Sequence, residues 1–451
     1  MASGLLAVLG KRALLRNTSS CCPFLSVHAC ATHVQNVREF SQKSEAEDAG
    51  KGQKQGRQAP PLSRRRYTTP SLDNVSSPST FANVLDGKKV AQQWLSEIAQ
   101  DVSLVKKHLH RPPGLAVVLV GNRADSVLYV NKKRQAAKEV GIDFQIKQLP
   151  EKVSQERLLK HLDGIFSDDH VDGVIVQLPL PRHIDEEAVL EHIDPHKDID
   201  GFHPLNVGRL AMRGVHPVFV PCTPLGSVEL LKRYGIDLLG KRVVILGNSN
   251  TVGTPLSVLL RDEGASAVTV CHCTSIDFAN QRKHYSKVED GTIRAVADAC
   301  LPPLQDGGGS SGGGKRHLPA SCISSIPDIT RTADVLFVAI GYPELVKKDW
   351  VKEGCIVVDI GINAKAKNGR NINEVAKEML GYGKATRSSS SSCEVEICGD
   401  VDFDEVGEVA SAITPVPGGS GPMTIAALLA NCTLSATRRI QNCNRRRKDE
   451  K

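Results

Sequence analysis

A phenol and an amine lie one helical turn apart near residue 130. Tyr129 and Lys133 are four positions apart, and side chains with this spacing share one face of a helix. Apolar residues follow, and Gly141 is a residue type that commonly ends helices, so we expect a helix that stops there. The spacing also fits a surface lysine beside a half-buried tyrosine, and other segments must decide between the two interpretations.

An apolar run ends in polar residues farther along the chain. Val174-Ile-Val is followed by Gln177 and two prolines, which is typical of a buried strand whose end carries chemistry. Asp200 comes next, in the turn Lys197-Asp-Ile-Asp-Gly201, and an ordinary turn or capping role is the alternative for it. If these segments lie near the helix, the amide of Gln177 and the carboxylate of Asp200 would join Tyr129 and Lys133 in one site.

Proline and glycine define two further segments. Thr223 and Pro224 are suited to the cap and first turn of a helix. Between residues 414 and 424, prolines and glycines are too dense for a strand or a helix. We expect a rigid loop there, whose backbone N–H groups can approach a ligand closely.

In this order, the segments resemble the methylenetetrahydrofolate dehydrogenase/cyclohydrolase family from about residue 84 to about residue 439. The matching motifs are Tyr-x3-Lys, VQLPLP, KDIDG, PCTP, a glycine-rich turn and PVPGGSGPMT. The resemblance implies two steps on one folate. A hydride leaves 5,10-methylenetetrahydrofolate for NAD(P), and water then opens the methenyl product to 10-formyltetrahydrofolate.

The resemblance also implies roles for individual residues. Lys133 would accept the proton of the attacking water, and Gln177 would hold the lysine by a hydrogen bond. Tyr129 would lie against the pterin, and Asp200 would accept hydrogen bonds from its nitrogens, since a carboxylate offers only acceptors. The remaining substrate-binding positions would be Val176, Leu178, Pro417, Gly418, Gly419, Gly421, Pro422 and Thr424.

A second domain begins with the apolar run Arg242–Leu246 and the turn from Gly247 to Gly253. A strand, a glycine turn and a helix can hold a pyrophosphate, although the spacing differs from G-x-G-x-x-G. Further strands at 267–272, 333–341 and 355–363 favour a doubly wound sheet. The cofactor-binding positions would be Thr223, Gly247, Asn248, Ser249, Gly253, His272, Cys273, Ile362 and Thr424.

The choice between NADP and NAD depends on two departures from the family. Asn248 stands where many members carry an arginine for the 2′-phosphate, and Cys273 stands where a serine is common. The acidic residue that selects NAD is also missing at that strand end. We expect NADP, with NAD as the alternative. The hypothetical source of the missing charge is Arg282, Lys283 or Lys287.

The expected fold is α/β. An N-terminal α/β substrate domain (83–222) precedes a doubly wound, Rossmann-like NAD(P)-binding domain (223–412) with insertions at about 276–325 and 365–394. The active-site loop and a helix from Ile425 to Ile440 (413–440) return to the first domain, and a basic tail (441–451) follows. Residues 1–82 have no acidic residue before Glu39, which is typical of an organelle transit peptide. We expect a mitochondrial location, with another organelle or the cytosol as alternatives.

Charge and cysteine content exclude several classes. The leader carries +6 and the tail +3 of the formal +7, so the body carries −2 and is no basic nucleic-acid surface. No segment is apolar enough to span a membrane. The 13 cysteines show no CxxC pair, so we expect reduced thiols and no metal site. No GxxxxGK[ST] loop is present, which argues against an ATP-dependent synthetase.

Two other functions remain as alternatives. One is a dehydrogenase on a related two-domain plan, of the shikimate or amino-acid type, and the other is a catalytically silent folate-binding protein. By family resemblance the enzyme would be a homodimer.

Overall fold

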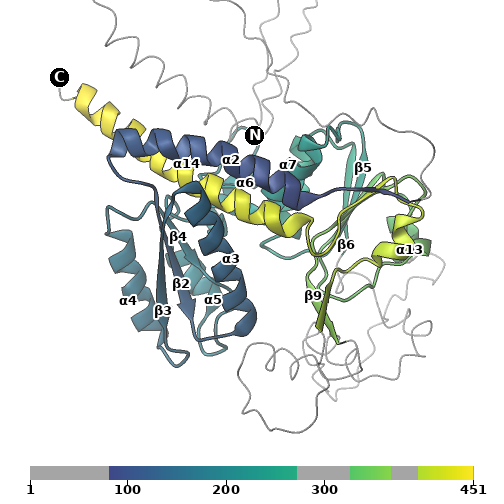
Figure 1. The fold of residues 1–451 in the computed structure, drawn as a ribbon, viewed down its shortest axis with the longest axis horizontal. Helices are drawn as coiled ribbons and strands as arrows, with labels where there is room; N and C mark the ends of the chain where they lie inside the picture. The colour runs from purple at the N-terminus through teal and green to yellow at the C-terminus, as the bar shows by residue number, and fades with distance from the viewer. Residues whose placement is uncertain (1–80, 272–325, 367–394, 450–451) are drawn as a thin grey trace, which may run out of the picture.

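Two parallel β-sheets with surrounding helices make up the part of the chain that the computed structural model describes, residues 81–271, 326–366 and 395–449 (Figure 1). The leader up to residue 80, most of both insertions, and the site candidates His272 and Cys273 lie outside the described residues. None of the helices in the described ranges is long and apolar enough to cross a membrane.

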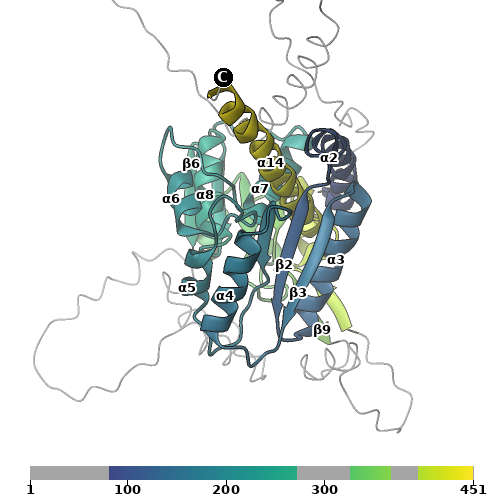
Figure 2. The same ribbon diagram turned by 90° about the vertical axis from the view of Figure 1, so that its left-hand side faces the viewer.

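The smaller sheet has three parallel strands in the order β3-β2-β4. Their bounds are β2 (Gly114–Val120), β3 (Asp143–Leu149) and β4 (Gly173–Val176). Every residue of β2 and β4 is buried, because helices cover the sheet and leave no face for water. The helices of this part are α3 (Ala124–Val140), α4 (Gln155–Phe166) and α5 (Glu186–His192), and α6 (Pro204–Ala211) follows them and lies beside α8 (Gly253–Asp262) (Figure 2).

The helix expected around Tyr129 and Lys133 is confirmed. It is α3, and Gly141 ends it with a φ of 83°, a left-handed conformation that glycine adopts without strain. The strand expected before Gln177 is likewise confirmed as β4. Both elements were recognisable because apolar periodicity and the stop signal are local features of the sequence.

The larger sheet has six parallel strands in the order β1-β11-β8-β7-β5-β6. Its strands are β1 (Asn83–Val84), β5 (Arg242–Leu246), β6 (Ala267–Cys271), β7 (Val335–Val338), β8 (Ile356–Asp359) and β11 (Ala412–Ile413). β6 lies on one side of β5 and β7 on the other, so the strand order reverses beside β5 as in doubly wound nucleotide-binding sheets. The expected α/β fold class, with a Rossmann-like second domain, is confirmed.

Smaller elements complete this part. They are α8 (Gly253–Asp262), α11 (Ile326–Thr330), the 3₁₀ helix η3 (Lys348–Trp350), α13 (Phe403–Gly407) and the antiparallel pair β9 (Asn363–Ala366) and β10 (Val395–Cys398).

The position of β1 corrects the assignment of residue 83 to the first sheet's domain. Asn83 and Val84 pair with Ala412 and Ile413 of β11, so the chain forms the edge of the larger sheet before it enters the smaller one. Two residues carry no periodicity that would reveal this pairing. The helix that follows, α2 (Gly87–Leu109), then crosses toward the smaller sheet (Figure 1).

The last helix, α14 (Ser420–Asp449), corrects two expected boundaries. It begins five residues before Ile425, because Pro422 lies in the first turn, where a helix needs no N–H donor. It also continues through residues 441–449, which were expected to form a tail. Thirty residues span roughly 45 Å, so α14 starts beside the larger sheet and ends beside the smaller one (Figure 1). The expected return to the first domain is confirmed.

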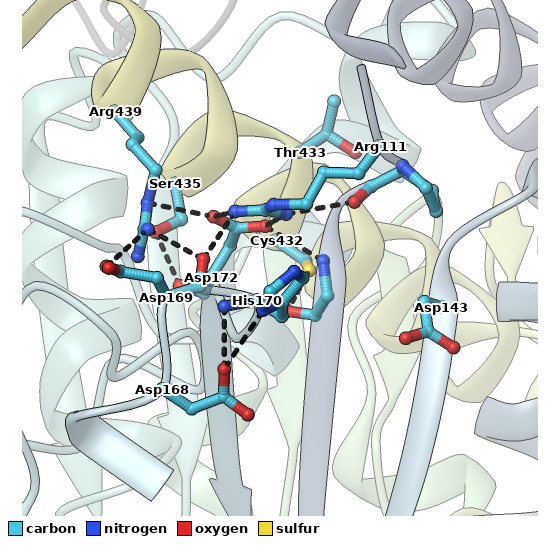
Figure 3. A network of polar contacts seen from close by, with 12 residues as sticks. Arg111, Asp143, Asp168, Asp169, His170, Asp172, Cys432, Thr433, Ser435 and Arg439 are labelled. Carbon is cyan, nitrogen blue, oxygen red and sulfur yellow. Dashed lines mark hydrogen bonds and ion pairs between the residues drawn. The ribbon is translucent and has the colours of Figure 1, made fainter. Parts of the chain in front are cut away.

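Charged side chains anchor the far end of α14 to the smaller sheet (Figure 3). Asp172 is 1% exposed and precedes β4. It accepts two hydrogen bonds from Arg111, at 2.7 and 3.0 Å, and lies 3.2 Å from Arg439 Nε on α14. Ser435 donates to the backbone oxygen of Asp172 at 2.6 Å. A buried carboxylate with this many donors fixes the position of α14 at Ser435 and Arg439.

Candidate active site

Lys133 and Gln177 meet at the carboxyl edge of the smaller sheet. Lys133 Nζ donates to Gln177 Oε1 over 3.1 Å. The amide is fixed from its other side, because Gln177 Nε2 donates to the Leu178 oxygen over 2.9 Å. Gln177 N also donates to the Val118 oxygen, which ties the residue to the end of β2. The two side chains come from α3 and from the end of β4, so the sheet brings together residues 44 positions apart.

The two aspartates of the KDIDG turn have different roles. Asp198 is 1% exposed, and its carboxylate accepts hydrogen bonds from the N–H groups of Gly201, Phe202 and His203 and from the Asn206 amide. Burial raises the pKa of Asp198 to about 7, although these donors favour the charged form. Asp198 is therefore the residue that holds the turn together, which was the alternative considered for Asp200.

Asp200 lies within electrostatic range of Lys133. Removal from water raises the pKa of its carboxyl, and the positive charge of Lys133 acts in the opposite direction. Its side chain makes none of the turn's own hydrogen bonds that Asp198 accepts. The structure thus joins Lys133 to Gln177 by a hydrogen bond, and the charge of Lys133 acts on the buried Asp200 carboxyl.

Tyr129, Val176 and Leu178 border this point. Tyr129 is half-buried on α3, and Lys132 Nζ lies 5.9 Å from the centre of its ring. Val176 is 2% exposed and belongs to the core, so it can offer a ligand only its backbone. Leu178 is half-buried just beyond the strand.

The segment from Pro417 to Thr424 is divided between a loop and the start of α14. Pro417, Gly418 and Gly419 precede the helix, whereas Gly421, Pro422 and Thr424 lie within its first turns. The loop is held against α2, because Lys88 N donates to the Gly418 oxygen over 2.9 Å. Thr424 Oγ1 lies 3.3 Å from Thr223 Oγ1 on α7 (Cys222–Arg233), so two of the cofactor candidates are neighbours.

Thr223 is not the cap of α7. The helix begins at Cys222 with Pro221 as its N-cap, and no side chain caps it. The helix therefore starts two residues earlier than the cap pattern indicated. Thr223 instead presents its hydroxyl to α14.

The turn after β5 has the close backbone packing expected of a phosphate-binding turn. A Cβ at Gly253 would lie 2.0 Å from the Gly247 oxygen, so only glycine fits at the start of α8. Ser249 accepts a hydrogen bond from Val252 N over 3.1 Å. The Asn248 Oδ1 atom accepts from Thr254 Oγ1 over 3.0 Å, which leaves the amide N–H₂ as the donor of this side chain. Asn248 and Ser249 are exposed, and these residues fit a dinucleotide whose phosphates lie over the turn.

Ile362, the remaining described cofactor candidate, is 46% exposed, just beyond β8. His272, Cys273, Arg282, Lys283 and Lys287 belong to the residues that the structure does not describe.

Sequence reasoning missed several buried polar residues next to the site. Asn431 of α14 donates to the oxygens of Ile199 and Val220, over 2.9 and 3.0 Å. It thereby links the KDIDG turn, which contains Ile199, to the residue that precedes the PCTP segment. The Cys222 thiol donates to the same Ile199 oxygen, and burial raises its pKa well above the usual value. Asp359 and Asp400 lie at the edge of the larger sheet. Their partners are distant in sequence, so no local pattern signals them.

A dinucleotide-type turn on one sheet and a lysine–amide–carboxylate group on the other define a two-domain α/β enzyme that uses a nicotinamide cofactor. The matching family models narrow this class. One, described as tetrahydrofolate dehydrogenase/cyclohydrolase, catalytic domain, matches residues 85–200. The other, described as the NAD(P)-binding domain of the same enzyme, matches residues 221–296 and 319–440. The chain belongs to the tetrahydrofolate dehydrogenase/cyclohydrolase family.

Individual relatives agree. The chain is 40% identical over 361 residues to the bifunctional protein FolD 4, chloroplastic, of Arabidopsis thaliana, covering 80% of this chain and 81% of the relative. It is 38% identical over 359 residues to FolD 1, mitochondrial, of the same plant, covering 79% and 81%. The FolD structure of Trypanosoma brucei, solved with NADP and an inhibitor, has a TM-score of 0.61 at 32% identity and covers 80% of this chain and 98% of that one. The chain is a bifunctional methylenetetrahydrofolate dehydrogenase and methenyltetrahydrofolate cyclohydrolase.

Proposed function

We propose that Lys133, Gln177, Tyr129 and Asp200 carry both reactions on one bound folate. The observation that supports this most directly is the 3.1 Å hydrogen bond from Lys133 to Gln177, beside which the charge of Lys133 also acts on the buried Asp200 carboxyl. Asp200 accepts hydrogen bonds from the amino and ring nitrogens of the pterin, and Tyr129 lies along the ring. These contacts place the one-carbon bridge near the end of β4.

When bound, the nicotinamide takes the hydride from the methylene bridge. The protein contributes orientation to that step, because Tyr129 and Asp200 fix the pterin while the loop 417–419 and the first turn of α14 border the folate. The methenyl carbon is then cationic and electrophilic. Water adds to it, Lys133 in its neutral form accepts the proton of the water, and the ring opens to 10-formyltetrahydrofolate.

The remaining substrate contacts follow from the placement of the segments. Val176 and Leu178 offer backbone groups at the end of β4, and Gly418, Gly419 and Gly421 allow the other chain segment to approach closely. Pro417 and Pro422 keep that segment rigid, and Thr424 adds a hydroxyl beside Thr223. Absorbance at the methenyl product's band, after methylenetetrahydrofolate and cofactor are added, tests the reaction. Absence of product with either dinucleotide would overturn it.

We further propose NADP rather than NAD as the cofactor. The support is a relative solved with NADP and the exposed Asn248, whose amide is a neutral donor that suits a 2′-phosphate better than an acidic side chain would. Ratios of kcat/KM measured with NADP and NAD test the assignment. The expected ratio favours NADP, and a ratio in favour of NAD would contradict it.

We propose that residues 1–82 are a leader that directs the protein to mitochondria. We also propose that residues 85–222 and 223–412 form the folate and dinucleotide domains, with β1 completing the sheet of the second. The support for the leader is the absence of acidic residues before Glu39 and a mitochondrial relative. A fluorescent reporter fused after residue 70 should enter mitochondria, and a cytosolic or plastid signal would contradict this.

The homodimer is also a proposal, supported by the family alone. Sedimentation of the purified full chain should give twice the 48.6 kDa chain mass. A monomer at micromolar concentration would contradict it.

A further inference from the structure

Two buried carboxylates outside the proposed catalytic set lie at the carboxyl edge of the larger sheet. Asp359 is the last residue of β8 and is 2% exposed, and Asp400 follows β10 and is 0% exposed. Burying a carboxylate is costly unless donors surround it, so each such group needs a structural or functional reason.

Asp400 accepts hydrogen bonds from the backbone of the loop that follows β7. Its Oδ2 atom accepts hydrogen bonds from Ile340 N at 2.6 Å and Gly341 N at 2.9 Å, and its Oδ1 atom accepts from Tyr342 N at 2.9 Å. Asn363 of β9 donates a fourth hydrogen bond to Oδ1 over 2.8 Å. Three successive N–H groups converging on one carboxylate fix the path of this loop.

Asp359 joins the neighbouring segments. Its carboxylate accepts from Gly361 N at 2.9 Å, Asp400 N at 3.2 Å and Val401 N at 2.9 Å. Its backbone continues the connection, because Asp359 N donates to Thr414 Oγ1 over 2.7 Å and Ser420 Oγ donates to the Asp359 oxygen over 3.0 Å. The pair therefore links the ends of β7 and β8 to the loop before α14 and to its first residue.

These segments border the place where a doubly wound sheet binds its dinucleotide. The strand order reverses between β5 and β7, and the crevice beyond the carboxyl ends of these two strands is the binding position. A Cβ at Gly247 would lie 2.1 Å from the Ala339 oxygen, so the turn after β5 is packed directly against the residue that precedes Ile340. A shift of the loop after β7 would therefore be transmitted to the turn after β5.

We propose that Asp359 and Asp400 are positioning residues for the dinucleotide. Their carboxylates fix the loops after β7 and β8 in the form that accepts the cofactor, and the water step at Lys133 does not depend on the hydrogen bonds that Asp400 accepts from the loop after β7. The proposal depends on the bifunctional activity, which supplies one reaction that needs the dinucleotide and one that does not.

The test uses the full chain with Asp400→Asn. An amide keeps the size of the carboxylate but can accept through only one atom and turns two N–H groups toward donors. Titration of NADPH fluorescence without folate should show a dissociation constant raised about tenfold or more, since hydrogen bonds to charged groups are the strong ones. Hydrolysis of methenyltetrahydrofolate, with no dinucleotide present, should stay within about twofold of the parent rate.

Asp172→Asn is the matched control. Asp172 is also a buried carboxylate with several donors, but it lies before β4 of the smaller sheet, where it anchors α14, and not beside the larger sheet. The control should lose stability without a change in the dissociation constant for NADPH. If both variants weakened NADPH binding equally, Asp400 would act through general stability and the proposal would be wrong.

Asn363→Ala keeps the proposal testable if Asp400→Asn does not fold. It removes one donor to Asp400 from a partly exposed position and should raise the NADPH dissociation constant by about threefold, again with hydrolysis retained. An unchanged dissociation constant in folded Asn363→Ala or Asp400→Asn would overturn the proposal. Loss of hydrolysis in parallel with NADPH binding would also overturn it. A parent protein inactive in both reactions would instead refute the proposed function.

Discussion

Lys133 Nζ lies 3.1 Å from Gln177 Oε1, and Gln177 Nε2 lies 2.9 Å from the Leu178 oxygen. The contact with Leu178 sets the orientation of the Gln177 amide. It engages the Nε2 donor, so the Oε1 acceptor is the atom that points toward Lys133. A neutral acceptor orients an amine without adding a negative charge that would favour the ammonium form. The hydrogen bond thus fixes the position of the lysine amine.

Changing this amide tests its orienting role. Gln177→Leu should lower hydrolysis of the methenyl substrate by about tenfold to a hundredfold, because misplacement of a reacting group is costly. Gln177→Glu should lower it as well, since an anion stabilises the charged lysine. Gln135→Leu, at an exposed position of the same helix as Lys133, is the control. A Gln177→Leu enzyme with the parent's rate would show that the hydrogen bond does not matter.

Asp200 should give folate binding a pH dependence. Desolvation raises the pKa of its carboxyl, so protonation begins at a higher pH than the ordinary value near 3.9 and removes an acceptor from the pterin. The dissociation constant of folic acid should therefore rise on acidification while ordinary carboxylates are still ionised. Lys133→Met removes the charge that opposes this shift, so its binding should weaken at a still higher pH. Tryptophan fluorescence titrations measure both, and identical pH profiles would contradict the pairing.

Asn248 should control cofactor choice. Its Oδ1 is held by Thr254, and its N–H₂ group is the only donor that it presents. Asn248→Arg supplies a charge for a 2′-phosphate and should lower the KM for NADP by roughly tenfold, with little change for NAD. Asn250→Arg, at an exposed position of the same turn, is the control. Equal effects of the two substitutions on the KM for NADP would contradict the assignment of Asn248 to the 2′-phosphate site.

The glycine that begins α8 should matter for the dinucleotide and far less for hydrolysis. A Cβ at Gly253 would lie 2.0 Å from the Gly247 oxygen, so Gly253→Ala must displace the turn. We expect NADPH binding to weaken more than tenfold, measured by fluorescence titration. Gly208→Ala in α6 has nothing within 4 Å of the added Cβ and should leave binding unchanged or stabilise the helix by about 0.5 kcal/mol. Unchanged binding in Gly253→Ala would refute the assignment of the turn.

Local features of the sequence predicted the helix and the strand that carry the candidate site residues. The helix with Tyr129 and Lys133 is defined by its periodicity and its glycine stop, and the strand before Gln177 by a short apolar run. Both signals lie within a few residues. The family motifs then indicated which of these residues belong together.

Long-range contacts set the features that the sequence did not reveal. Asp198 and Asp200 have the same local context, and only the donors from Asn206 and the turn distinguish them. Asp400 depends on Ile340 and Asn363, which lie 60 and 37 positions away. The early start of α14 was hidden by Pro422, whose residue type usually indicates a loop.

Lys133→Met gives the most direct test of the account, with both activities measured on one preparation of the full chain. We predict that hydrolysis of methenyltetrahydrofolate falls at least a hundredfold, because a general base contributes about 10²–10⁴ to a rate, while folate binding persists. Lys138→Met, at an exposed position of the same helix, should behave like the parent. Hydrolysis by Lys133→Met at the parent's rate would contradict the assignment of Lys133 as the base for the water step.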